Sequence, residues 1–269
     1  MKVFGPDGPL LDFAMALEES QSKDRNGRLD LDLKREDKTI KLTLNVGTQY
    51  GTYSPKYPAE CAKSTRILKG LLSYLEKTQR KDGSWGSPPH DTFAPLALLA
   101  SGDPKHIELV RKNAKFHAST TKVKDRSWLI NWRYMAAAIV MSEFYLATAE
   151  KWVLPELQEV YDFLISSQYV NMAQIDEKSR KTHPGAVPKD NMGAHGGWGH
   201  NPGFEGYGPI SMLTGQGALA FAMMKHCGIK VDRKRHDKAY DFLVRASGRN
   251  GYVWYADQAA GPNNWADMG

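Results

Sequence analysis

The sequence has little cysteine and no long apolar segment. Its 269 residues include only two cysteines, Cys61 and Cys227, and two thiols do not indicate a disulfide framework. Residues 1–20 have no apolar core of the length that a signal peptide needs. The longest apolar run, residues 135–141, is far too short to span a bilayer, so we expect no transmembrane segment.

The sequence also lacks the composition of a nucleic-acid-binding module. Lysine and arginine number 36 against 30 aspartates and glutamates, which gives a formal net charge of +6. The basic residues cluster at 111–124 and 230–238, on expected outer helices or their ends, where a solvated face accounts for them. No basic strand carries interleaved aromatic residues, so we expect no nucleic-acid partner.

What the chain does have is a repeated pattern of an amphipathic helix, a glycine turn and an aromatic residue. In the first copy the apolar residues of 67–75 fall on one helical face, and the helix ends before Asp82 and Gly83. Glycine suits this end because it adopts the left-handed turn conformation without a Cβ clash. Later copies end at 161–168 and 240–247. The aromatic turns fall at Trp85, Trp128, Trp198, and the pair Tyr252 and Trp254.

Less polar helices are expected between these turns, at 92–100, 128–149 and 210–227. A helix that is apolar on all sides is buried on all sides. Amphipathic helices that alternate with buried ones predict two concentric layers, with about seven helices in antiparallel pairs over residues 60–254. We therefore expect an α/α toroid whose inner helices line an axis and whose outer helices face water. The number of helices is too small for a closed ring, so the toroid is incomplete.

The first 46 residues differ from the rest of the chain. Residues 10–19 read as a short helix, and strict alternation over 28–34 and 39–44 predicts a β-hairpin with its turn at 35–38. This order resembles the second half of a PDZ domain, without the carboxylate-binding loop. We expect three parts: 1–46 as the C-terminal half of a PDZ-like domain, 47–58 as a linker, and 59–269 as a toroid truncated at the C-terminus. The expected fold class is mainly α, with a partial PDZ-like α+β segment in front.

The first turn resembles a known repeat. Gln79-x-x-x-Gly83-x-Trp85 is similar to the Gln-Trp repeat of the terpenoid cyclase and protein prenyltransferase toroids, where Gln and Trp tie an outer helix end to the next inner helix. In prenyltransferases an Asp-x-Cys pair near an inner-helix start binds zinc, and residues 206–211 contain neither residue. The Asp-x-Asp-Asp acid motif of squalene-hopene-type cyclases is absent as well. The resemblance therefore implies the fold, while metal and cofactor stay unknown.

A narrower resemblance rests on four segments in fixed order. Residues 143–148, 153–155, 198–200 and 207–210 are similar to an uncharacterised bacterial family, common in planctomycetes, that joins a PDZ-like domain to a toroid. That family has no established activity. The resemblance implies an exported bacterial protein.

The densest polar and aromatic stretch is 190–207, directly before an expected inner helix. His195, His200 and Glu205 are candidate metal ligands or acid–base groups, although His-x4-His-x4-Glu is no established zinc spacing. In the alternative, the histidines bond backbone carbonyls and Trp198 packs between the layers. Helix N-termini present free N–H groups and a positive dipole end to a ligand, which favours a site in this stretch.

Glu143 is the other candidate for acid–base chemistry, since it interrupts an apolar helix. It follows Trp132 by three helical turns, so both residues lie on one face. Burial would raise the pKa of such a carboxylate and suit it to proton transfer. In the alternative, Glu143 is structural and pairs with a helix N-terminus, Arg133 or Arg126.

Two functions follow from these candidates. The first is a binding or scaffolding module that presents a toroid cavity to a polypeptide, a glycan or an apolar ligand, with the aromatic residues Trp132, Trp198 and Tyr207 as candidate contacts. The alternative is an enzyme of unknown class, such as a lyase, hydrolase or cyclase, with its site at the inner-helix N-termini. The enzyme hypothesis predicts that His195, His200 and Glu205 converge near Ile210 and that Glu143 faces the same cavity. The binding hypothesis predicts that the two histidines point apart.

Overall fold

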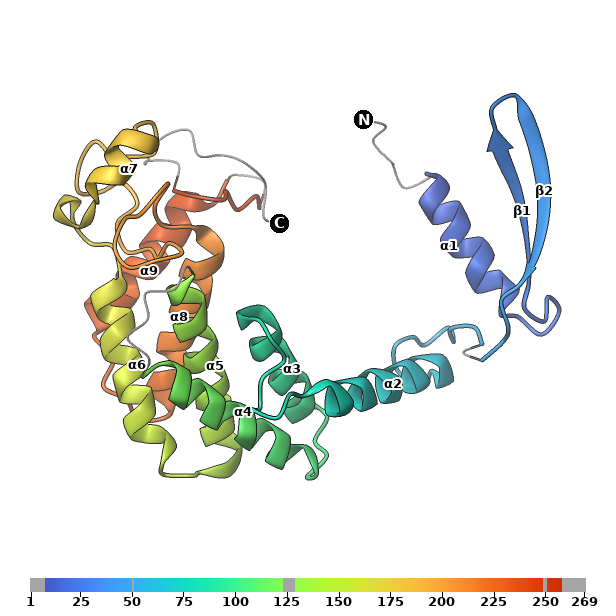
Figure 1. Ribbon diagram of the computed structural model, residues 1–269, viewed down its shortest axis with the longest axis horizontal. Helices are drawn as coiled ribbons and strands as arrows, with labels where there is room; N and C mark the ends of the chain where they lie inside the picture. The colour runs from blue at the N-terminus through green and yellow to red at the C-terminus, as the bar shows by residue number, and fades with distance from the viewer. Residues whose placement is uncertain (1–7, 50, 123–128, 249–250, 258–269) are drawn as a thin grey trace. The chain divides into compact units, whose positions relative to one another are not determined.

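The computed structural model describes residues 8–49, 51–122, 129–248 and 251–257 (Figure 1). This part of the chain is mainly helical, with one two-stranded antiparallel sheet, as the sequence predicts. The elements are α1 (Pro9–Ser20), β1 (Arg28–Arg35), β2 (Lys38–Asn45), α2 (Ala62–Thr78), α3 (Pro88–Ala100), α4 (His106–Thr120), α5 (Ile130–Thr148), α6 (Val153–Ser167), the 3-10 helix η1 (Met172–Gln174), α7 (Glu177–Thr182), α8 (Ser211–His226) and α9 (Arg233–Ala246).

The chain divides into two compact units, residues 1–77 and 78–269. The sequence places the domain boundary earlier, at residues 58 and 59, and assigns α2 to the toroid. That division stays a prediction. The backbone contacts group α2 as far as Lys77 with the first unit, where Lys63 of α2 forms an ion pair with Glu18 of α1. The functional identity of the two parts stays a prediction.

In the first unit α1 packs on β1, which pairs with β2. The register sets Leu29 opposite Leu44, Leu31 opposite Leu42, and Leu33 opposite Ile40, so all six apolar side chains share one face. Leu29 is buried, whereas the side chains of Leu33, Ile40, Leu42 and Leu44 are 39–45% exposed. The predicted hairpin is confirmed, and most of its apolar face lies open within the described residues.

The second unit consists of two helical layers. Helices α3, α5 and α8 pack side by side with α5 in the middle, and α4, α6 and α9 pack against them (Figure 1). Most of α5 is buried, including the run 134–142, because its apolar residues cover all sides of the helix. The outer helix α6 buries a single face that contains Leu157, Val160 and Leu164.

The three inner helices run parallel, with their N-termini at one end of the layers. At that end the Asn131 N–H of α5 donates to the carbonyl of His200, shortly before α8, at 3.1 Å. At the other end Cys227 Sγ, after α8, donates to the Ser142 carbonyl of α5 at 3.6 Å. Helix α3 follows the same direction, because residues 88–91 line a pocket with the start of α5, and 96–100 line another with its end.

A glutamine clamp recurs at two of the turns between outer and inner helices. Gln79 Nε2 donates to the carbonyls of Gly83 and Leu109 at 3.0 and 2.8 Å. Gln168 Nε2 donates to the carbonyls of Gly196 and Arg235 at 2.7 and 3.0 Å. In each clamp one carbonyl belongs to the turn and the other to the next outer helix, α4 or α9.

The glycine of each clamp has no room for a side chain. Gly83 and Gly196 have φ angles of 91° and 90°, and a Cβ on either would overlap the backbone of the following outer helix, at Lys112 or Lys238. Lys112 follows Leu109 by three residues, and Lys238 follows Arg235 by three. The two turns therefore share one geometry and one register.

The tryptophans of the two turns differ in burial. The resemblance of the first turn to the Gln-Trp repeat predicts that Trp85 is buried between an outer helix end and the following inner helix, but it is only partly buried, so that prediction is wrong. Trp198 is fully buried instead: its Nε1–H donates to the Leu164 carbonyl at 2.8 Å, and its ring packs edge-on against Phe221. The inner helix α5 precedes α8 and helps to cover Trp198. Among the described residues no inner helix precedes α3, so Trp85 has no equivalent cover. Trp128 lies outside the described residues.

Candidate functional site

The loop between α6 and α8 is held against the start of α5. Helix α5 has no capping side chain of its own at its N-terminus, and the loop supplies the missing acceptors. The His200 carbonyl accepts from the Asn131 N–H, and Asn201 Oδ1 accepts from the Ile130 N–H at 3.4 Å. The buried Asn131 side chain donates to the Gly199 carbonyl at 2.8 Å. These bonds fix the position of His200 above the first turn of α5.

Four partly buried aromatic side chains form a hydrogen-bonded row at this point, which we call the aromatic relay: Trp132, His200, Tyr207 and Tyr255. Trp132 Nε1 donates to His200 Nδ1 at 2.8 Å. His200 Nε2 lies 2.6 Å from the Tyr207 hydroxyl, which lies 2.8 Å from the Tyr255 hydroxyl. The relay joins α5, the loop and the segment after α9.

The direction of donation along the relay follows from Trp132. An indole N–H can only donate, so His200 Nδ1 accepts, and the neutral imidazole carries its proton on Nε2. His200 Nε2–H then donates to Tyr207, and the Tyr207 and Tyr255 hydroxyls share a hydrogen bond in which either can donate. Burial lowers the pKa of His200, against the opposing charge of Glu205, and burial raises the pKa of Tyr255. The relay therefore ends in two tyrosine hydroxyls, each of which can donate or accept a hydrogen bond.

The structure brings together some of the residues that the sequence proposes for this site and separates others. His200, Tyr207 and Trp132 come together in the relay. His195 has other partners: its Nε2 lies 3.3 Å from Lys238 Nζ, and burial together with Lys238 lowers its pKa. Glu205 is exposed. In the part of the chain that the structure describes, no group of three or more His, Cys, Asp or Glu side chains is placed to hold a metal ion.

Trp198 was a candidate ligand contact, and this prediction is wrong. The side chain is fully buried between α6 and α8, because Gly217 leaves a space for it: a Cβ on Gly217 would lie 2.7 Å from the indole ring. The ring therefore has no surface left for a ligand.

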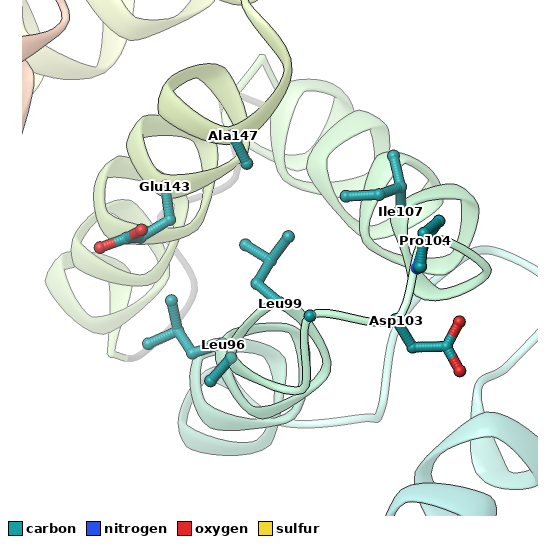
Figure 2. Close-up of a pocket in the computed structure, with 9 residues that line it drawn as sticks. Leu96, Leu99, Asp103, Pro104, Ile107, Glu143 and Ala147 are labelled. Carbon is teal, nitrogen blue, oxygen red and sulfur yellow. The ribbon is translucent and has the colours of Figure 1, made fainter.

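Glu143 lies at the other end of α5. It lines an open groove of about 610 Å³ with the ends of α3 and α5 and the start of α4. Figure 2 shows that the carboxylates of Glu143 and Asp103 point away from the groove centre, toward which Leu99 and Ile107 project. Trp132 precedes Glu143 by eleven residues, which is about 16 Å along a helix. The expectation that Glu143 faces the same cavity as the loop histidines is therefore wrong.

The sequence did not identify Tyr255 or the surroundings of Asp91. Tyr255 lies within the last aromatic turn, but nothing in the sequence pairs it with Tyr207. Asp91 is the simplest N-cap for an expected helix at 92–100, but the helix begins at Pro88. Asp91 is thus the fourth residue of α3, and its carboxylate accepts the backbone N–H of Trp85. A side chain that caps the preceding turn is not distinguishable in the sequence from one that caps its own helix.

No helix among the described residues is long and apolar enough to cross a membrane. Comparison with curated proteins gives no match, and none of the solved structures matches either. A family described as a domain of unknown function, DUF6288, matches residues 64–269, which is most of the chain. The chain therefore belongs to the DUF6288 family.

Proposed function

We propose that the chain is a binding module that recognises a glycan at the end of the layers where α5 and α8 begin. The observation that carries the proposal is the aromatic relay. A sugar ring has an apolar C–H face that packs on aromatic rings, and hydroxyl groups that both donate and accept hydrogen bonds. Four partly exposed rings and the adjoining hydroxyls of Tyr207 and Tyr255, which can donate and accept, match both properties.

The partners of His200 favour binding over catalysis. A general base needs a nitrogen or oxygen within reach of the substrate proton. Both ring nitrogens of His200 are used, Nδ1 by Trp132 and Nε2 by Tyr207. His195 bonds elsewhere and Glu143 lies at the far end of α5, so the relay positions its tyrosines without supplying an acid–base pair.

The proposal includes the finer fold. We propose that the two layers are an arc of an α/α toroid of the terpenoid cyclase and prenyltransferase type, and that α1, β1 and β2 are part of a PDZ-like domain. Three parallel inner helices, outer helices packed against them, and the twice-used glutamine clamp support the first statement. The order of helix and hairpin supports the second.

A glycan array followed by calorimetry tests the function. Wild-type protein and a Tyr255→Phe variant are compared, with Tyr252→Phe as the matched control, because Tyr252 is exposed and lies outside the relay. We expect Tyr255→Phe to weaken binding about tenfold or more, which corresponds to about 1.4 kcal/mol. The control should bind like wild type. Absence of any glycan ligand, or equal affinity of all three proteins, would refute the proposal.

A further inference from the structure

A separate pocket lies at the start of α3, and the relay does not include it. It has a volume of about 200 Å³ and is lined by the turn after Gln79, the first residues of α3, the end of α4 and the start of α5. Asp91, Phe116, His117, Arg80 and Arg133 give the pocket its chemistry.

His117 is fixed in this wall with an acceptor that the protein does not use. The side chain is 1% exposed, and its Nε2 faces the Asp91 carbonyl at 3.0 Å, so Nε2 carries the proton. Burial lowers the pKa of His117 to about 4, and the ring is neutral. Nδ1 is then an acceptor, and within the described residues it has no hydrogen-bond donor. A buried acceptor without a partner costs stability.

The second clamp shows that the fold does not require these polar residues. Leu109 and Arg235 hold equivalent places in the two clamps, so Asn113 and His117 of α4 correspond to Ala239 and Leu243 of α9. The fourth residue of the inner helix is Asp91 in α3 and Thr214 in α8, and each accepts the backbone N–H of the clamp tryptophan. The second clamp therefore forms with Thr, Ala and Leu where the first has Asp, Asn and His.

The groups in the pocket favour an uncharged ligand with hydroxyl groups. Two arginines, Arg80 and Arg133, and two carboxylates, Asp82 and Asp91, line the pocket, so the formal charges balance. The carboxylates already accept backbone N–H groups of the turn, at Ser84 and Trp85. His117 Nδ1 needs a donor, which a hydroxyl supplies. Phe116 adds an apolar wall.

We infer that this pocket binds a neutral hydroxylated molecule of monosaccharide size, with one hydroxyl donating to His117 Nδ1. The volume suits one sugar ring, and the balance of charge disfavours ions of either sign. The inference does not depend on the relay, because its residues are different and its signal comes from His117 alone.

Two substitutions separate the ligand contact from the structural one. In His117→Gln the amide nitrogen takes the place of Nε2 and keeps the bond to the Asp91 carbonyl, while the acceptor at Nδ1 is lost. In His117→Asn the amide oxygen takes the place of Nδ1, and the bond to the Asp91 carbonyl is lost. A site that uses Nδ1 predicts that the asparagine variant retains more binding than the glutamine variant.

The experiment uses the full chain with D-glucose, D-galactose and D-mannose as neutral probes, and glucuronate and glucosamine as charged probes of the same size. Calorimetry measures affinity, and nitrogen NMR follows His117 Nδ1 in the wild-type protein. We expect at least one neutral probe to shift the Nδ1 resonance and to bind at least tenfold more weakly to His117→Gln. The NMR signal tests the inference even if a variant does not fold.

Three outcomes would overturn the inference. In the first, the Nδ1 resonance already indicates a hydrogen bond in buffer, and its chemical shift does not change when any neutral sugar is added. Water alone would then fill the pocket. A charged probe binds more tightly than the neutral ones. A sugar binds His117→Gln as tightly as it binds the wild type, or its binding is lost in Tyr255→Phe instead. The second result would place the sugar at the relay.

Discussion

Trp198 allows a sharp test of the layered packing. Replacing a fully buried tryptophan by alanine costs about 3–5 kcal/mol of unfolding free energy, mostly through the cavity it leaves. Trp198 has 0% exposure, and its indole N–H donates to the Leu164 carbonyl, so we expect Trp198→Ala to fall in this range. Trp85 is only partly buried, and for Trp85→Ala we expect about half that loss.

Urea unfolding followed by far-ultraviolet circular dichroism gives both losses. Gly217 provides the internal control, because a Cβ there would lie 2.7 Å from the Trp198 ring. Gly217→Ala should therefore destabilise the wild type by about 1–3 kcal/mol through overpacking, and should cost much less in the Trp198→Ala background. Equal losses for the two tryptophan variants, or additive effects of Gly217→Ala and Trp198→Ala, would refute this account of the packing.

The remaining predictions concern other buried groups. Gln168→Ala removes three hydrogen bonds, two to carbonyls and one from Arg235, whereas Gln79→Ala removes two, so urea unfolding should show the larger loss for Gln168→Ala. His117 has a folded-state pKa of about 4 against an ordinary value of 6.5, so its neutral form stabilises the fold above pH 6.5. Stability should fall by up to about 3 kcal/mol as the pH drops from 6.5 to 4, and His117→Gln should abolish this part of the fall; an unchanged pH profile would contradict it. Hydrogen bonds from Ser64 and Ser54 lower the pKa of Cys61 to about 6, and burial raises that of Cys227. Alkylation rates of single-cysteine variants should therefore titrate at lower pH for Cys61 than for Cys227, and identical profiles would contradict the assignment.

The helices were predictable because their burial is encoded in spacing. One apolar face on α6 and an apolar surface all round α5 are local properties of the sequence, and they fix which helix is inside. The hairpin was predictable for the same reason, since strict alternation places every second side chain on one face. The structure has both strands within one residue of the expected ends.

Burial of a turn residue was less predictable, because it depends on neighbours that are distant in sequence. Trp85 and Trp198 follow similar glycine turns, but only Trp198 has an inner helix on both sides. The candidate site was predictable in part: Trp132, His200 and Tyr207 were chosen for their place at helix starts, and they meet there. Tyr255 was missed because it joins Tyr207 across 48 residues. Glu143 was placed on the correct helix face but at the wrong height along the axis.

The glutamine clamp has a consequence for how this chain can acquire new sequence. Three residues separate Gln79 from Gly83, and 27 separate Gln168 from Gly196, yet both pairs close in the same geometry. Closing the longer loop costs only about 2 kcal/mol more chain entropy, and the loop offsets this by packing Tyr169 and Ile175 into a small core with Phe204 and with Phe242 of α9. The packing of the helical layers at the clamp therefore does not depend on the length of the turn. A longer turn between Gln79 and Gly83 should for this reason leave the packing of the helical layers intact, as the 27-residue loop of the second clamp already does.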